Sequence, residues 1–128
     1  MTLFWKLNTS LAALYGALCV GGAAALMHLW QSTLQGGQLA VLISAGFILA
    51  LHCLALLALG AAEKLQQQSP WLSCIVAIAL HLGCCGFVFT LVGGVFSWSL
   101  HWGQLAPLSG QLLIISWLLL AFSPWIRK

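Results

Sequence analysis

Four long apolar stretches alternate with short polar ones along the 128-residue chain. Each apolar stretch is about 20 residues long, the length that an α-helix needs to cross the hydrocarbon core of a bilayer. None of them shows the alternating segments of about ten residues that form transmembrane β-barrels. The pattern therefore predicts an all-α integral membrane four-helix bundle, built as a single membrane domain (1–128). The predicted helices lie at about residues 10–30, 39–62, 71–93 and 108–125.

Three polar segments separate the predicted helices. Residues 31–38 contain Gly36-Gly37, which is typical of a turn. Residues 63–70 are the most polar part of the chain and end in a proline, which suits the first turn of the third helix. Residues 97–107 combine tryptophan with polar residues, as interfacial loops do. The exact end of the third helix stays open, because two adjacent glycines near its predicted end can break a helix or only loosen it.

Composition supports a membrane location and excludes several functions. Charged residues make up 4% of the chain and hydrophobic residues 62%, with a mean hydropathy of +1.08, whereas soluble domains carry about 25% charged residues. The single acidic residue, Glu63, is expected at the cytoplasmic edge beside Lys64, as an interfacial ion pair worth little. A membrane interior without a carboxylate argues against proton-coupled export and carboxylate-dependent hydrolysis. No nucleotide loop or basic patch indicates a nucleic-acid partner.

The basic residues predict the orientation of the chain. Lys6, Lys64 and the Arg127-Lys128 pair fall in three regions that share one side of a four-span protein, and the other two loops carry no Lys or Arg. The positive-inside rule therefore places both termini in the cytoplasm. Six of the seven tryptophans fall near predicted helix ends, as in an aromatic belt, and Trp117 is the exception. The first apolar run continues to Trp30, too long for a signal peptide, and is expected to be a retained helix.

A stripe of small residues marks the first predicted helix. Ala13, Ala17, Gly21 and Ala25 recur at four-residue spacing and so share one face. Small residues let helices approach closely in lipid, where the hydrophobic effect does not drive them together. The stripe is therefore predicted to be a helix-packing or partner face. Its spacing leaves open whether it packs inside the bundle or against another membrane protein.

Two histidines are the candidates for chemistry. His52 and His81 each lie ten or eleven residues from the predicted cytoplasmic side, about 15 Å deep at 1.5 Å per residue. Histidines at matched depth on neighbouring helices suit the axial ligation of haem b. In the alternative interpretation they are neutral side chains that form hydrogen bonds within the bundle. The five cysteines fall inside predicted helices without Cys-x-x-Cys spacing, and they are expected to be free thiols that pack as small hydrophobic residues.

Three segments carry a resemblance to a known family. The first predicted helix closes in Ala-Ala-Ala-Leu-Met-His28, His52 follows 24 positions later in HCLALLAL, and the fourth begins Pro107-Leu108-Ser109-Gly110 and reaches Trp117. In these segments, in this order and at similar spacing, the chain resembles the small four-helix bacterial inner-membrane proteins of the YgdD type, a family of unknown function. The resemblance implies four spans in the bacterial inner (cytoplasmic) membrane and supplies no catalytic residues.

The chain also departs from the pattern of that family. Ile48-Leu49 stand where the family has Tyr-Gln, and Ser109 and Ser116 replace glycines. The family's Ser-Gly-Ser-Leu-Tyr segment is not recognisable near Thr90, and His81 matches no family feature. The histidine pair therefore gains no support from the resemblance.

These observations lead to one expected function and one alternative. We expect a non-enzymatic small membrane protein, an accessory or assembly subunit of a larger inner-membrane complex, with a respiratory complex as one candidate. The expected partners are the lipid bilayer and other integral membrane subunits, with no cofactor, no metal and no catalytic residue. The alternative is a redox membrane subunit that binds haem b or a quinone near His52 and His81. A small transporter with a neutral polar path is a third interpretation.

Overall fold

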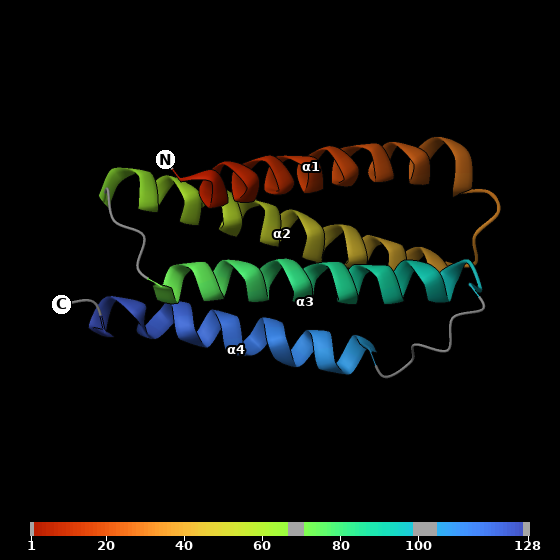
Figure 1. Cartoon of the computed structure of the whole chain (residues 1–128). Helices are drawn as coiled ribbons and strands as arrows, with labels where there is room; N and C mark the ends of the chain where they lie inside the picture. Colours follow the sequence, from red (N-terminus) through yellow and green to blue (C-terminus); the bar gives the residue numbers. More distant parts are fainter. Residues whose placement is uncertain (1, 67–70, 99–104, 127–128) are drawn as a thin grey trace.

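The computed structural model describes residues 2–66, 71–98 and 105–126, and all regular structure within these ranges is helical (Figure 1). All four long helices are long and apolar enough to cross a membrane. The predicted all-α architecture of a multi-pass membrane protein is therefore confirmed. The helices are α1 (Leu3–Ala25), which continues into the short π-helix η1 (Leu26–Trp30), then α2 (Gly36–Gln66), α3 (Trp71–Val95) and α4 (Leu105–Ile126).

The first helix begins seven residues before its predicted start. Its first turns contain the polar residues Asn8 and Thr9. Both side chains satisfy their polar groups within the protein: the Thr9 hydroxyl donates to the Trp5 carbonyl at 2.9 Å, and the Asn8 amide donates to the Leu56 carbonyl at 3.0 Å. These bonds remove the cost of placing the residues in a helix that packs against its neighbours.

Two glycine pairs near predicted helix ends lie inside helices: one was predicted to form a turn, and the effect of the other was left open. Gly36-Gly37 form the first turn of α2, where the Gln38 side-chain oxygen accepts a hydrogen bond from the Gln35 backbone N–H at 3.0 Å. Gly93-Gly94 lie within α3, which ends at Val95. The prediction of a turn extending to residue 38 is therefore wrong. The predictions that concern residues 67–70, 99–104 and 127–128 lie outside the described residues.

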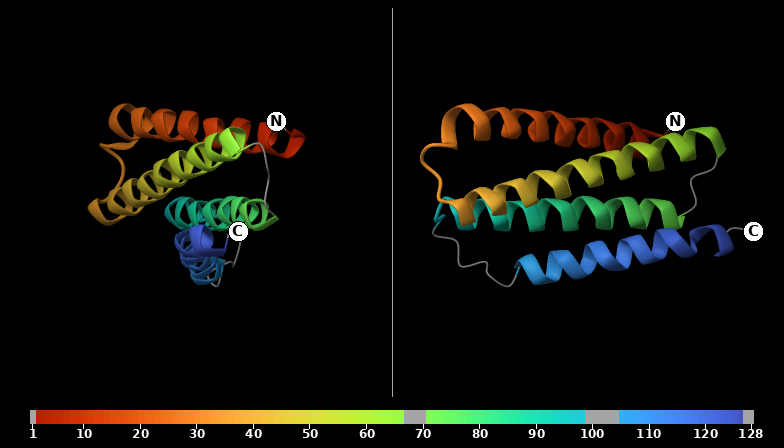
Figure 2. Two further views of the ribbon diagram at one scale, coloured as in Figure 1. Left: turned by 90° about the vertical axis from the view of Figure 1, so that its left-hand side faces the viewer. Right: turned by 180° about the vertical axis from the view of Figure 1, so that it is seen from behind.

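The helices pack in a row that follows the order of the chain. α1 packs against α2, α2 against α3, and α3 against α4. The end-on view in Figure 2 places α1 and α4 on opposite sides of the row. It also shows α2 running obliquely, close to α1 at one end and close to α3 at the other. The outer faces of the row are covered with exposed leucine, isoleucine and phenylalanine, which suits a surface in contact with lipid.

Glycines allow close approaches between neighbouring helices. A Cβ atom on Gly83 of α3 would lie 2.7 Å from Leu113 Cδ2 and 3.2 Å from the Ser109 carbonyl oxygen of α4. A Cβ atom on Gly60 of α2 would lie 3.2 Å from the Asn8 amide nitrogen of α1. Small residues at these crossings bring the helices together without a hydrophobic driving force.

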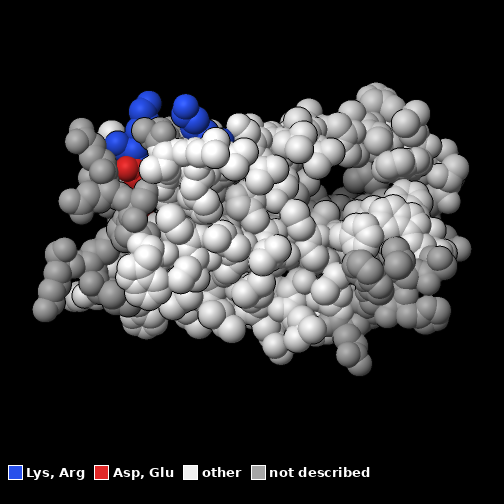
Figure 3. All heavy atoms as spheres, in the orientation of Figure 1, with Lys and Arg blue, Asp and Glu red and all other residues white. Residues whose placement is uncertain are grey.

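The described lysine and glutamate side chains gather at one end of the row (Figure 3). α1 begins and α4 ends at this same end (Figure 1). We call this the lysine end. Glu63 is only 3% exposed, so the prediction that it lies outside the bundle is wrong. The reason is that α2 continues to Gln66. In its last part the Glu63 side chain faces the protein, while Lys64 stays exposed.

Candidate functional site

Polar side chains from α1 and α3 form a partly buried hydrogen-bonded chain between these two helices. The phenolic oxygen of Tyr15 lies 2.8 Å from His81 Nδ1 and 3.0 Å from Cys85 Sγ. His81 Nε2 lies 3.1 Å from the side-chain oxygen of Asn8. The Asn8 amide nitrogen in turn lies 3.0 Å from the Leu56 carbonyl of α2. We call these four side chains, Asn8, His81, Tyr15 and Cys85, the polar chain.

The backbone carbonyl at one end fixes the direction of every bond in the polar chain. The Leu56 carbonyl can only accept, so Asn8 directs its amide nitrogen there and presents its oxygen to His81. A neutral imidazole has one donor and one acceptor nitrogen, so Nε2 of His81 donates to Asn8 and Nδ1 accepts. Tyr15 therefore donates its hydroxyl proton to His81. The thiol of Cys85 is then the group that donates to the phenolic oxygen.

Helical spacing explains why these residues meet. The buried face of α1 consists of Trp5, Asn8, Ala12 and Tyr15, spaced three or four residues apart. Ala12 is fully buried between the two polar residues, and its small side chain lets α1 approach its neighbours. Asn8 and Tyr15, the only asparagine and tyrosine of the chain, were not singled out by the sequence analysis. Their seven-residue spacing, two turns of one helix face, was the available signal.

His52 belongs to a separate hydrogen-bonded pair between α2 and α4. Its side chain is 2% exposed, and its Nδ1 lies 2.7 Å from the Ile48 carbonyl one turn earlier in the same helix. Its Nε2 accepts a hydrogen bond from the indole N–H of Trp117 at 3.2 Å. This bond explains why Trp117 lies within a span rather than at a helix end, since an indole N–H within the membrane needs an acceptor.

The two predicted histidines thus interact with opposite neighbours. His81 contacts α1 and His52 contacts α4, and both ring nitrogens of each histidine form hydrogen bonds. These hydrogen bonds match the interpretation in which the two histidines bond to other groups within the bundle, and not the one in which they ligate haem. Ligation of a haem iron would replace one of these bonds on each ring. Among the described residues, no three His, Cys, Asp or Glu side chains lie close enough together to hold a metal ion.

The five cysteines are free thiols, as predicted. Cys53 and Cys84 are buried, and Cys19 donates to the Gly46 carbonyl at 3.4 Å. Cys85 differs from the expected buried thiol, because its residue is exposed and its sulfur contacts Tyr15. Cys85 therefore combines an exposed position with a contact to the Tyr15 hydroxyl, unlike the buried Cys53 and Cys84.

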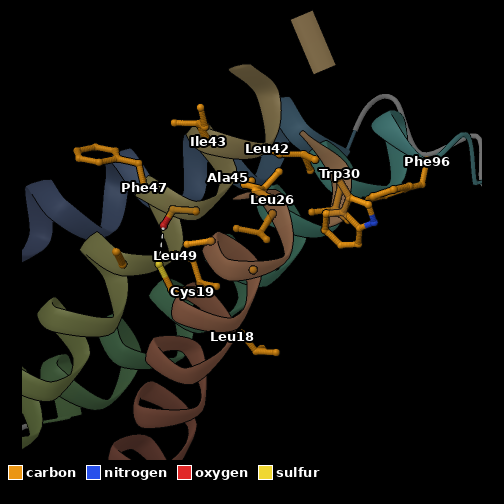
Figure 4. Close-up of a pocket in the computed structure, with 16 residues that line it drawn as sticks. Leu18, Cys19, Leu26, Trp30, Leu42, Ile43, Ala45, Phe47, Leu49 and Phe96 are labelled. Atoms are coloured by element: carbon orange, nitrogen blue, oxygen red, sulfur yellow. Dashed lines mark hydrogen bonds between the residues drawn. The ribbon is translucent and has the colours of Figure 1, made fainter. Parts of the chain in front are cut away.

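An apolar cleft opens beside the polar chain, toward the end of the row opposite the lysine end. One cavity of about 480 Å³ lies between the end of α1, the beginning of α2 and the end of α3, and is lined by Leu26 and Trp30 of η1 (Figure 4). A second cavity of about 750 Å³ is lined by Tyr15 and Cys85. The two cavities share several lining residues and therefore adjoin, and together they are called the apolar cleft. The shared residues are Leu18, Leu49, Val88 and Val92.

The small-residue stripe of α1 lies away from the packing face of that helix. Ala13, Ala17 and Gly21 are exposed and Ala25 is half-buried. A Cβ atom on Gly21 would meet no atom within 4 Å. The face that α1 buries against the bundle is formed by other residues. Ala13, Ala17 and Gly21 therefore do not pack inside the bundle, which was one of the two uses left open for the stripe.

Comparison with known proteins adds no relative. No protein-family model, no curated protein and no solved structure matches this chain. The similarity to the YgdD type described above therefore stays a prediction.

Proposed function

We propose that this chain is a non-enzymatic accessory or assembly subunit of a larger complex in the bacterial inner membrane, with both termini in the cytoplasm. The observation that carries the proposal is the exposed small-residue face of α1, formed by Ala13, Ala17 and Gly21. In lipid, small residues on a helix surface do not stabilise the protein by themselves, but they allow a second helix to approach closely. A face that the chain does not use internally is available to another membrane subunit.

The row arrangement supports the same proposal. Because α1 lies at one side of the row, with α2 as its main neighbour, its opposite side is open to a partner helix. The exposed surface is otherwise apolar, and the described part of the chain includes no extra-membrane domain that would recognise a soluble partner. Recognition would therefore take place within the bilayer, through packing and interhelical contacts.

A larger side chain on this face of α1 is expected to weaken the binding of the partner. The Ala17→Leu variant of the tagged protein, purified in mild detergent, should lose at least tenfold of a co-purifying membrane protein that the wild type holds stoichiometrically. Ala121→Leu places the same side chain on an exposed position of α4 and should retain the partner. A wild-type protein that purifies as a monomer without any stoichiometric partner contradicts the proposal, as does equal retention by both variants.

A second candidate function is a redox membrane subunit that binds haem b or a quinone near His52 and His81. The polar chain favours it, because a histidine and a tyrosine in contact beside a cleft form the kind of polar group that marks a ligand site in a membrane interior.

An optical spectrum of the purified protein tests the haem version directly. A Soret band that is lost in both His52→Ala and His81→Ala would support axial ligation by the pair, and His28→Ala, at an exposed position of η1, is the matched control. Wild-type protein without a Soret band removes the haem version and leaves the quinone version standing.

A further inference from the structure

The polar chain and the apolar cleft meet at Tyr15 and Cys85, and we propose that this junction binds a lipophilic quinone or quinol of the membrane. In this arrangement the headgroup lies against Tyr15 and Cys85, and the isoprenoid tail follows the cleft toward η1. The inference rests on the quinone version of the second candidate function and names its site. It concerns binding and does not depend on the small-residue face of α1.

The hydrogen-bonding groups at the junction fit a headgroup oxygen. The hydroxyl proton of Tyr15 is held by His81, so the groups left to contact a ligand are the phenolic oxygen and the Cys85 thiol. Both residues line the larger cavity. A carbonyl oxygen can accept from the thiol in place of the phenolic oxygen, and a hydroxyl group can donate to the phenolic oxygen while accepting from the thiol. The same pair therefore serves both a quinone and its reduced quinol.

The depth of the junction selects this class of lipid. Tyr15 lies twelve residues beyond the start of α1 at Leu3, and Cys85 lies ten residues before the end of α3 at Val95. At 1.5 Å per residue these distances are about 18 and 15 Å, close to the middle of a hydrocarbon core about 30 Å thick. Phospholipid esters and phosphates lie at the interface, so they do not reach the junction. Prenylated quinones are uncharged, so their headgroups can enter the hydrocarbon core at a lower cost than a phosphate.

The size and lining of the cleft suit an aromatic headgroup with an apolar tail. Ligand sites commonly have volumes of about 300–1,000 Å³, and the two adjoining cavities measure about 750 and 480 Å³. Phe89 and Trp98 line the cavity that contains the polar groups, with ring centroids 5.1 Å apart, and they can stack on a planar ring. The other cavity is lined almost entirely by apolar side chains, which is what an isoprenoid tail requires.

Ubiquinone with two isoprene units, titrated into wild-type protein in phosphatidylcholine bilayer discs, is expected to quench tryptophan fluorescence in a saturable manner. Val92→Phe fills the cleft at a residue that lines both cavities and should weaken this component at least tenfold. Ile78→Phe adds a similar side chain at an exposed position of α3 that lines neither cavity and should leave it unchanged. Cys85→Ala removes the donor but leaves the bond between Tyr15 and His81, and should weaken it about threefold to tenfold.

The outcomes separate this site from the broader function. Quenching that rises linearly with quinone in the wild type, without saturation, overturns the inference, because it reports only partition into the bilayer. Saturable binding that is equal in Val92→Phe and Ile78→Phe overturns the site while leaving a quinone-binding subunit intact. Binding that Cys85→Ala does not weaken overturns the assignment of the headgroup to the junction. Far-ultraviolet circular dichroism and gel filtration establish that each variant is folded.

Discussion

Replacing His81 with phenylalanine is expected to lower the free energy of unfolding by about 2–4 kcal/mol. The imidazole joins Tyr15 of α1 to Asn8 of the same helix from its position on α3. Phenylalanine fills a similar volume but offers neither a donor nor an acceptor. The Tyr15 hydroxyl and the Asn8 side-chain oxygen would each lose a partner where no water is available to replace it, which costs about 1–3 kcal/mol for each group.

Unfolding in mixed micelles with an increasing fraction of sodium dodecyl sulfate measures this change. His28→Phe, an exposed position of η1, should change the free energy of unfolding by less than about 0.5 kcal/mol. Combining His81→Phe with Asn8→Leu should cost less than the sum of the two single changes, because the second removes one of the groups that the first leaves without a partner. Additive effects would show that the hydrogen bonds of the polar chain do not act together.

Replacing Gly83 with valine is expected to lower the free energy of unfolding by about 2–3 kcal/mol. A Cβ atom there would lie 2.7 Å from Leu113 Cδ2 and 3.2 Å from the Ser109 carbonyl oxygen. The leucine can rotate away, but the backbone carbonyl moves only if α3 and α4 separate. Separation would weaken the whole interface between these two helices, where α4 makes its main packing contacts.

Gly94→Val is the matched control for Gly83→Val. It lies in the same helix and introduces the same side chain, but a Cβ atom there meets nothing within 4 Å. Both variants therefore share the change in helix propensity, which is within about 1 kcal/mol, and differ in the contact with α4. Denaturation curves measured in one detergent should separate the two variants by at least about 1.5 kcal/mol. Equal losses of stability would mean that the tight contact between α3 and α4 does not contribute.

The sequence predicted the four spans because lipid imposes a simple rule on composition. A helix that crosses the bilayer must be apolar over about 20 residues, and this requirement is visible along the chain without any knowledge of tertiary contacts. The ends of the helices were less predictable. Asn8 and Gly36-Gly37 carry local signals against a membrane helix, and the contacts that reverse those signals come from Leu56 on another helix and from a side-chain cap by Gln38.

The candidate site was predictable only in part. His81 was identified because an ionisable residue within a membrane span is rare, but its partners Tyr15 and Asn8 come from a different helix, and neither carried a distinguishing signal. His52 and His81 were matched in depth, yet depth does not determine the direction in which a side chain points. The structure directs them to α4 and α1 respectively.

Composition and the length of the apolar runs by themselves determined that this protein is an all-α, multi-pass membrane protein. They also determined that histidines and thiols outnumber carboxylates, since the chain has four histidines, five cysteines and one acidic residue. The tertiary structure alone decided which face of each helix is buried. It turned the stripe of Ala13, Ala17 and Gly21 outward and turned Glu63 inward. The physical reason is that lipid constrains the average polarity of a span, whereas the rotation of each helix depends on a few contacts between residues distant in sequence.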